Sequence, residues 1–171
     1  AVACADITHM PIADTSMDLI FSASALQWVH TLGDVYAEAY RVLKPEGMIA
    51  IATYVEGTLH ELHQAMNQAG WPVWSFASLQ AHKDALTAAG FVVCLDEVSS
   101  LESTYPSLRA LLRSLKEVGA NRYYPSTQPV MRPMQLRQLE LCYDQQFLSA
   151  QGVKATWRIA YLLARKGRQI L

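Results

Sequence analysis

The sequence lacks the features of a disulfide-stabilised or metal-binding protein. It contains three cysteines among its 171 residues. Cys4, Cys94 and Cys142 are far apart and follow no metal-ligand spacing, so we expect reduced, mostly buried thiols and no disulfide bonds, as in a cytoplasmic protein. His60 and His63 are one helical turn apart, but no third ligand accompanies them, which favours a polar helix face over a metal site.

The sequence also lacks an excess of charge and any long apolar run. Its 14 Lys and Arg residues and 15 Asp and Glu residues give a net charge of -1, so we expect neither a nucleic-acid nor a membrane partner. No apolar run approaches the ~20 residues that a membrane-spanning helix needs. The chain begins with Ala1 instead of Met, and nothing resembles a signal peptide, so we expect the sequence to begin inside a longer protein.

The first third of the chain contains a strand, a helix and a second strand in succession. Residues 17–21 are expected to form a central strand, and residues 34–42 a helix capped by Asp34. Pro and Gly in residues 44–47 predict a turn, and residues 48–54 form a continuous apolar run typical of a strand. This order predicts one unit of a parallel α/β sheet, in which ligands bind at the carboxyl ends of the strands.

The chain on either side of this unit predicts further elements. Residues 1–5 are short and apolar, as at the end of a buried parallel strand, and Asp6 then begins a loop that Pro11 keeps extended. Residues 101–150 precede the last strand and are too long for a hairpin, so we expect a lid that selects the substrate. The other expected elements are helices over 58–68, 78–89, 107–118 and 133–147, and strands over 91–98 and 156–164.

Several motifs resemble those of class I S-adenosylmethionine-dependent methyltransferases. The matching positions are Asp6, Met10, Pro11, Asp18, Arg41, Leu43, Lys44, Pro45 and Gly47. With Gln27, Trp28 and the segments 57–64 and 113–120, they make the chain similar to the malonyl-[acyl-carrier protein] O-methyltransferases of biotin synthesis. The resemblance covers nearly the whole chain, but the first strand and the glycine-rich loop of the family are not found in it.

The resemblance implies that residues 1–171 are part of a methyltransferase domain of the α/β class. Its Rossmann-like sheet would be mostly parallel with an antiparallel last strand, without the N-terminal strands, and residues 101–150 would be the helical lid. The implied reaction is methyl transfer from S-adenosylmethionine to the free carboxylate of malonyl-acyl-carrier protein, an early step of biotin (pimelate) synthesis in the cytoplasm. A carboxylate is already ionised at neutral pH and needs no general base, which agrees with a sequence that indicates no catalytic residue.

The resemblance assigns the adenine of the cofactor to Asp6 and Ile7. The carboxylate of Asp6 would accept a hydrogen bond from the exocyclic amine, which only donates, and the amide of Ile7 would meet a ring nitrogen. The alternative is that Asp6 only caps its own loop.

Four more residues are expected near the cofactor. Ser22 and Ala23 end the predicted central strand, and their small side chains would admit the methionine part of the cofactor; the alternative is simple packing beneath a helix. Gln27 and Trp28 follow closely, and an indole would favour the sulfonium through its π face. A Trp in this place is also commonly a core residue.

Substrate contacts are expected in the lid. Arg113 and Lys116 lie along one face of a predicted helix, with Arg109 one turn earlier. With Arg122 and Tyr123, these cations would meet an acidic carrier protein, its phosphopantetheine phosphate or the malonyl carboxylate. The alternative is a solvated helix face.

Two other functions stay open. Fold motifs specify a cofactor better than an acceptor, so the substrate could instead be another small carboxylic acid. The chain could also be a non-catalytic methyltransferase-like fragment. Dependence on the carrier protein separates the first alternative from the implied reaction, and cofactor binding separates the second.

Overall fold

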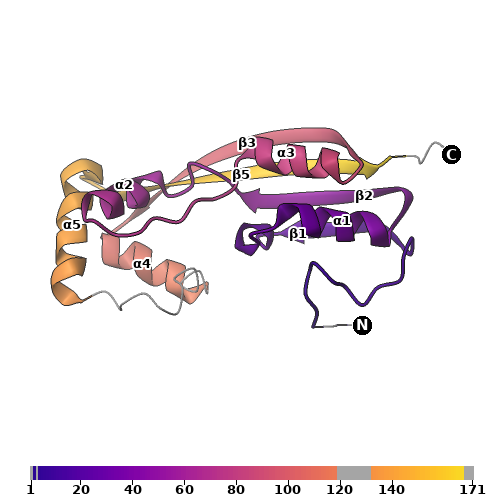
Figure 1. The fold of residues 1–171 in the computed structure, drawn as a ribbon. Coiled ribbons are helices and arrows are strands. Elements are labelled where there is room, and N and C mark those ends of the chain that lie inside the picture. The colour runs from indigo at the N-terminus through magenta and orange to yellow at the C-terminus, as the bar shows by residue number, and fades with distance from the viewer. Residues whose placement is uncertain (1, 3, 119–131, 168–171) are drawn as a thin grey trace. The chain divides into compact units, whose positions relative to one another are not determined.

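The computed structural model describes residues 2, 4–118 and 132–167 (Figure 1). The predicted site residues Arg122 and Tyr123 lie outside these ranges. Among the helices of the described residues, none has the length and apolar character that crossing a membrane requires.

The chain divides into two compact units, each with its own hydrophobic core. The first unit consists of residues 1–56, 76–99 and 158–171, and the second of residues 57–75 and 100–157. Two long strands, β3 and β5, include residues of both units. The second unit contains the described part of the predicted lid together with residues 57–75, which the sequence did not associate with it.

A mixed sheet forms the centre of the first unit. Its strands are β1 (Met17–Ala23), β2 (Leu43–Tyr54), β3 (Phe91–Tyr105) and β5 (Gly152–Lys166), in the spatial order β1-β2-β5-β3. β1 pairs parallel to β2, and β5 pairs antiparallel to β2, with Ile49 opposite Ala164. The predicted antiparallel last strand is therefore confirmed.

Helices α1 (Leu32–Val42) and α3 (Leu79–Ala88) pack on this sheet. The buried residues of α1 are Val35, Tyr36, Ala39 and Val42, which follow the helical period. On β2, Ile49 and Ile51 are buried while Ala50 between them is half-buried, as the period of two in a strand requires. The same core includes Leu26, Leu86, Phe91, Ala160 and Leu162.

A buried polar pair joins α1 to α3. The hydroxyl of Tyr36 and Nδ1 of His82 lie 2.6 Å apart, and both residues are almost fully buried, at 0% and 1% exposure. Burial raises the pKa of Tyr36 and lowers the pKa of His82 to about 4. The hydrogen bond satisfies two polar groups that would otherwise destabilise the core.

The C-terminal end of α1 is capped by a lysine from another element. Nζ of Lys166, on β5, donates to the carbonyls of Tyr40 at 2.6 Å and Leu43 at 2.8 Å, and it lies 4.3 Å from the centroid of the Tyr40 ring. A cation at this end of a helix interacts favourably with the carbonyl dipoles. Burial lowers the pKa of Lys166.

The predicted turn at residues 44–47 is wrong, because these residues belong to β2, which begins at Leu43 and is irregular there in its pairing with β1. Leu43 is opposite Met17, but Met48 is opposite Leu19, so β2 has more residues than β1 between these two pairs. A Cβ on Gly47 would lie 2.8 Å from the carbonyl oxygen of Lys44, which leaves room only for glycine.

Three further expectations for the first unit are wrong. Cys4 and Cys94 are exposed, whereas the sequence favoured mostly buried thiols. The described residues 2, 4 and 5 are exposed and form no strand, whereas the sequence favoured the end of a buried one. Asp34 is not the N-cap of α1, because the helix begins earlier, at Leu32, with Thr31 at the cap position and Asp34 in the first turn. An acid in the first turn still stabilises the helix dipole.

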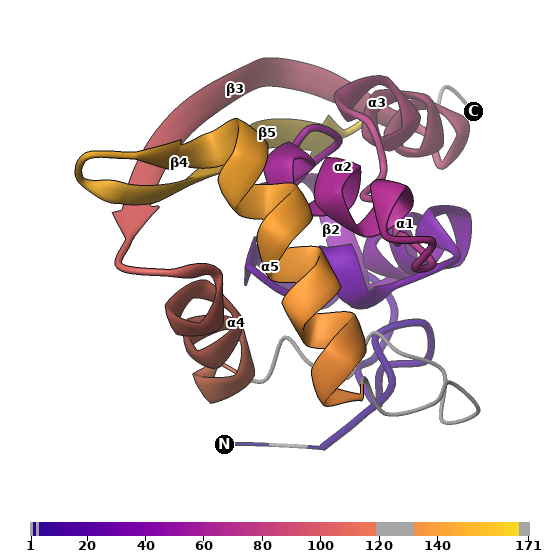
Figure 2. The same cartoon turned by 90° about the vertical axis from the view of Figure 1, so that its left-hand side faces the viewer.

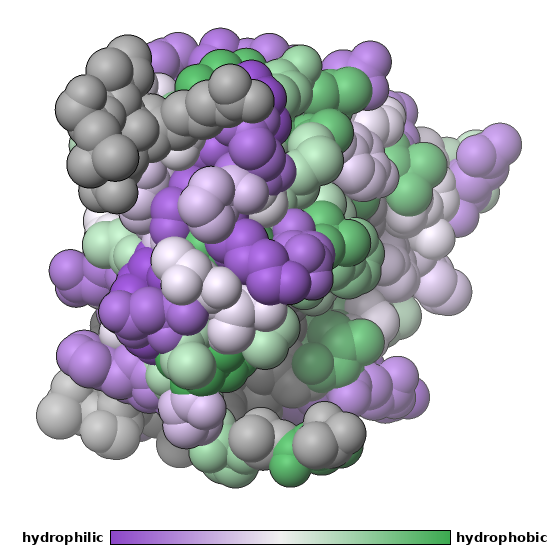
Figure 3. All heavy atoms as spheres, turned by 90° about the vertical axis from the view of Figure 1, so that its right-hand side faces the viewer, coloured by the Kyte–Doolittle hydropathy of each residue, from purple (hydrophilic) through white to green (hydrophobic). Residues whose placement is uncertain are grey.

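Among the described strands, β1 lies at the edge of the sheet, whereas the sequence predicted a central strand, and its apolar side chains are exposed. Leu19 and Phe21 are 57% and 72% exposed, and Met17 is 37% exposed. An edge strand of this kind offers unpaired backbone groups to another segment. On the face of the molecule shown in Figure 3, hydrophilic and hydrophobic residues are interspersed.

The second unit is mainly helical (Figure 2). Its helices are α2 (His60–Gln68), α4 (Leu108–Glu117) and α5 (Pro133–Phe147), and the short strand β4 (Leu148–Ser149) pairs with β5. The core contains Leu62 and Met66 of α2, Leu108 and Leu111 of α4, and Leu139 and Tyr143 of α5. Helix α5 has the predicted bounds, because Pro133 begins it at a position where its missing N–H costs nothing.

A buried carboxylate joins α2 to β5 within this unit. Glu61 is 1% exposed and accepts hydrogen bonds from both the amide and the hydroxyl of Thr156. Buried charges need such partners.

The His82 pair predicts a pH-dependent stability. The folded-state pKa of His82 lies below its ordinary value of 6.5, so the unfolded chain binds a proton first as the pH falls. The contribution of neutral, buried His82 to the free energy of unfolding is complete above pH 6.5 and is lost as the pH falls towards 4. In urea unfolding, we expect His82→Gln to remove about 2 kcal/mol of the stability loss that the wild type shows between about pH 8 and pH 5.

Tyr36→Phe is the matched control for this prediction. It removes the hydroxyl but keeps the burial that lowers the pKa of His82, so the pH dependence should persist. Parallel losses of stability in the wild type and in His82→Gln would contradict the prediction.

Candidate functional site

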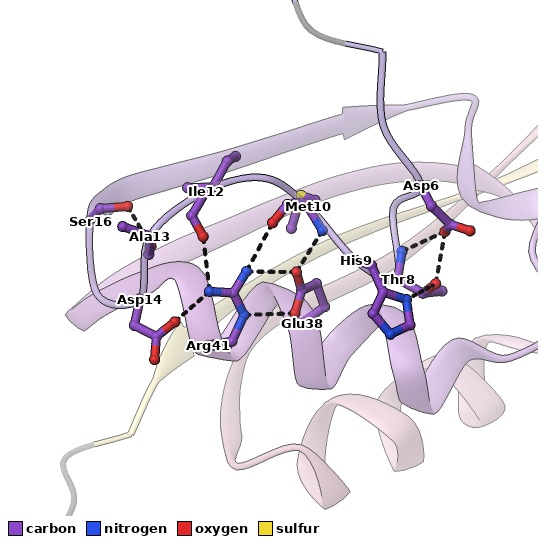
Figure 4. A network of polar contacts seen from close by, with 10 residues as sticks. All are labelled: Asp6, Thr8, His9, Met10, Ile12, Ala13, Asp14, Ser16, Glu38 and Arg41. Carbon is purple, nitrogen blue, oxygen red and sulfur yellow. Dashed lines mark hydrogen bonds and ion pairs between the residues drawn. The ribbon is translucent and has the colours of Figure 1, made fainter.

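Asp6 occupies a tight turn at the start of the loop that precedes β1. Its Oδ1 accepts hydrogen bonds from the amide and the hydroxyl of Thr8, both at 2.8 Å, and its carbonyl accepts from the amide of His9 at 3.0 Å (Figure 4). The amide of Thr8 makes the largest contribution to holding the pKa of Asp6 below its usual value.

Asp6 therefore caps its own loop, as the alternative interpretation predicted, but it does so through only one of its two carboxylate oxygens. Both side-chain hydrogen bonds are on Oδ1, and the residue is exposed. Within the described part of the chain, no hydrogen bond is made to Oδ2. Ile7, beside it, packs against the core of the first unit, which anchors the turn. A cap on one oxygen leaves the other as an acceptor for a ligand.

The carboxyl end of β1 is formed by small residues. Ser22 is opposite Ile51 and is half-buried, while Ala23 is opposite Ala52 and is exposed. The next residue, Ser24, has a positive φ of 52° and turns the chain out of the strand. Exposed small residues at this end of a parallel strand give a ligand access to the backbone.

Gln27 has a structural role that the sequence did not indicate. It lies in the 3-10 helix Leu26–Trp28, is 8% exposed, and its Nε2 donates to the carbonyl of Ser24 at 2.8 Å. Its Oε1 accepts from the hydroxyl of Thr53, on β2, at 3.3 Å. These contacts fix the turn that follows β1. Trp28 is 38% exposed, so its indole is not a fully buried core residue.

Two charged residues of α1 fasten the loop after Asp6 to the helix (Figure 4). Arg41 donates to both carboxylate oxygens of Glu38, at 2.8 and 2.7 Å, and to the carbonyls of Met10 and Ile12, at 3.1 and 2.8 Å. It also forms an ion pair with Asp14. The amide of Met10 donates to Oε1 of Glu38 at 2.6 Å.

In the sequence, Arg41 was predicted only as a family marker, and Glu38 was not predicted at all. The available signal was their spacing of three residues, which places an acid and an arginine on one helix face. Hydrogen bonding from Arg41 lowers the pKa of Glu38 to about 2 and raises that of Arg41, so the pair is charged at any physiological pH.

The described substrate candidates lie on α4 in the second unit. Arg113 and Lys116 are exposed. Arg109, on the same helix, forms an ion pair with Glu140 of α5, and this contact gives it a structural role within the unit. Arg122 and Tyr123 lie outside the described residues, so their expected place beside Arg113 and Lys116 stays a prediction.

The histidines of α2 have local contacts. His63 stacks edge-on against Trp74, with ring centroids 4.6 Å apart, and burial lowers its pKa to about 4. Nδ1 of His60 lies 3.5 Å from Glu61. In the ranges that the structure describes, no group of three His, Cys, Asp or Glu residues is placed to hold a metal ion.

Comparison with known proteins supports a methyltransferase. The family model for a methyltransferase domain matches residues 1–51. A malonyl-[acyl-carrier protein] O-methyltransferase from Laribacter hongkongensis is 34% identical over 94% of this chain, and one from Geobacter sulfurreducens is 33% identical over 96%. The chain spans 55% of the first of these proteins and 65% of the second.

Solved structures agree with the fold of the chain. A candidate methyltransferase from Bacillus halodurans aligns with 96% of this chain and 76% of its own, at a TM-score of 0.61 and 14% identity. The YcgJ protein from Bacillus subtilis aligns with 96% of this chain and 70% of its own, at a TM-score of 0.64 and 15% identity. The chain has the class I methyltransferase fold. The resemblance to malonyl-[acyl-carrier protein] O-methyltransferases noted in the sequence is likewise confirmed over most of the chain.

In this methyltransferase fold, the candidate site residues of the first unit come from the Asp6 turn and from the segment that ends β1. The structure gives Asp6 and Gln27 contacts within the protein, and it leaves Ala23 and Trp28 exposed. Whether they contact a cofactor stays a prediction.

The contacts of Gln27 predict a loss of stability on its truncation. Gln27→Ala removes two hydrogen bonds and leaves the hydroxyl of Thr53 without this partner, which should cost about 1–3 kcal/mol in the free energy of urea unfolding. Gln80→Ala is the control, because this exposed glutamine also bonds a side chain, Asp84, but should cost less than about 0.5 kcal/mol. Equal effects would show that Gln27 does not hold the turn.

Proposed function

We propose that this chain carries part of the S-adenosylmethionine site of a carboxyl O-methyltransferase whose acceptor is malonyl-acyl-carrier protein. The observation that carries the proposal is the similarity over 94% of the chain to a protein with this activity in its name. The early step of biotin synthesis and a cytoplasmic location belong to the same proposal. The chain spans 55% of that relative, so its similarity covers part of the protein that carries this name.

The first unit has features that fit the adenosine part of this cofactor. Asp6 is exposed and keeps Oδ2 as an acceptor, which matches an exocyclic amine that only donates. Ser22 and Ala23 end β1 with small side chains, which supports access to the backbone there. Bound S-adenosylmethionine would supply a methyl group activated by its sulfonium charge.

The residues of the chain would then act by orientation. The acceptor carboxylate is ionised at neutral pH, so no side chain has to remove a proton. Arg113 and Lys116 are the proposed contacts for the carboxylate or for the acidic carrier, since a guanidinium binds carboxylate and phosphate through paired donors. Alignment of the carboxylate and exclusion of water would supply the rate enhancement. In this proposal, residues 101–150 act as the substrate lid.

Asp6→Asn tests the cofactor role apart from the capping role. Asparagine keeps an oxygen that can accept from Thr8, but it replaces the second oxygen with an amide that donates towards a donor. We expect the dissociation constant for S-adenosylhomocysteine, measured by calorimetry, to rise about tenfold or more without a change in thermal stability. Unchanged affinity would remove Asp6 from the site, and no binding by the wild-type chain would favour a non-catalytic fragment.

Arg113→Ala tests the substrate role of the second unit. In a protein that methylates malonyl-acyl-carrier protein, we expect KM for the carrier to rise about fivefold with kcat little changed, because removal of a rim charge mainly weakens association. Arg137→Ala, which removes an exposed arginine of α5, is the matched control. Equal KM values for the two variants would contradict the assignment, and activity on free malonate without the carrier would favour a small acid as substrate.

A further inference from the structure

The loop that bears Asp6 is held to α1 by one arginine that uses every hydrogen-bond donor it has. A guanidinium carries five N–H groups. In Arg41, Nε and one N–H of Nη2 bind the carboxylate of Glu38, and the other N–H of Nη2 faces the carbonyl of Met10. Nη1 donates to the carbonyl of Ile12 and to Asp14.

Glu38 completes the attachment from the other side. Its Oε1 accepts from the amide of Met10 at 2.6 Å as well as from Arg41. Both polar backbone groups of Met10 are therefore bound by the same pair of side chains. The Glu38 side chain is only 11% exposed, so these charge-assisted hydrogen bonds are partly shielded from water.

Backbone contacts fix the far end of the same loop. The amide of Thr15 donates to the carbonyl of Arg41, and the amide of Ser16 donates to the carbonyl of Val42, both at 2.9 Å. The loop is thus tied to α1 from Met10 onwards, and Asp6 lies four residues before the first tie.

We propose that Glu38 and Arg41 are positioning residues, which set the conformation of residues 6–14 so that Asp6 meets the adenine of the cofactor. The inference rests on the function proposed above. Neither side chain touches the ligand in this account. The pair acts through the backbone of Met10 and Ile12, and a binding residue has to be held within about 0.5 Å of its productive geometry by the residues around it.

Arg41→Lys is the informative variant. Lysine keeps the positive charge but has only three donors and no planar fork, so it cannot bind Glu38, Asp14 and two carbonyls together. We expect the dissociation constant for S-adenosylhomocysteine to rise about tenfold. Hydrogen exchange at the amide of Met10 should also become faster. Arg165→Lys, which alters an ion pair with Glu46 in the same unit, is the control and should leave both quantities unchanged.

A double-mutant cycle separates positioning from general stability. If Arg41 acts through Asp6, the affinity loss caused by Arg41→Lys should shrink to less than about threefold in an Asp6→Asn background. Equal losses in both backgrounds, or no loss in either, would overturn the positioning role while the proposed function stands. Absence of binding by the wild-type chain would overturn the proposed function and this inference together.

Discussion

The interaction on which the candidate site depends is the attachment of Arg41 to the loop before β1. This loop has few apolar anchors, among them the partly buried Ile7, so packing alone does not define its path. The guanidinium binds two loop carbonyls, the carboxylate of Asp14 and the carboxylate of Glu38 at once. A loop that is held by specific hydrogen bonds can present a turn such as that of Asp6 in one conformation.

In the proposed reaction, the candidate cofactor residues and the candidate substrate residues belong to different units. All of the candidate cofactor residues belong to the first unit, whose sheet ends provide small and exposed residues such as Ala23. The described cationic candidates, Arg113 and Lys116, belong to the second unit, whose core of α2, α4 and α5 is separate. A methyltransferase needs one surface for a constant cofactor and another for a particular acceptor, and separate cores allow the second to vary without disturbing the first.

The sequence was sufficient where a local signal determines the structure and insufficient where pairing does. Helix α5 was predicted with its bounds, and α3 was predicted to within one residue at each end. The structure shows the local signals there: Pro133 begins α5, and the side chain of Ser78 caps α3. β3 and β5 are longer than expected, since their polar ends are strands only through pairing with other segments. The strand expected before Asp6 is absent from the described residues for the same reason. The link from Arg41 to its loop joins positions about thirty residues apart, which no local pattern reveals.

The most direct test of the account is to locate S-adenosylhomocysteine on the chain by nuclear magnetic resonance. Amide signals of a nitrogen-15-labelled sample would be followed during a titration with the ligand. We expect saturable shifts at Asp6, Ile7 and Ala23, with the amides of Leu111 and Leu139 in the core of the second unit unchanged. Shifts that omit the Asp6 turn, or no saturable shifts at all, would contradict the claim that the first unit carries part of the cofactor site.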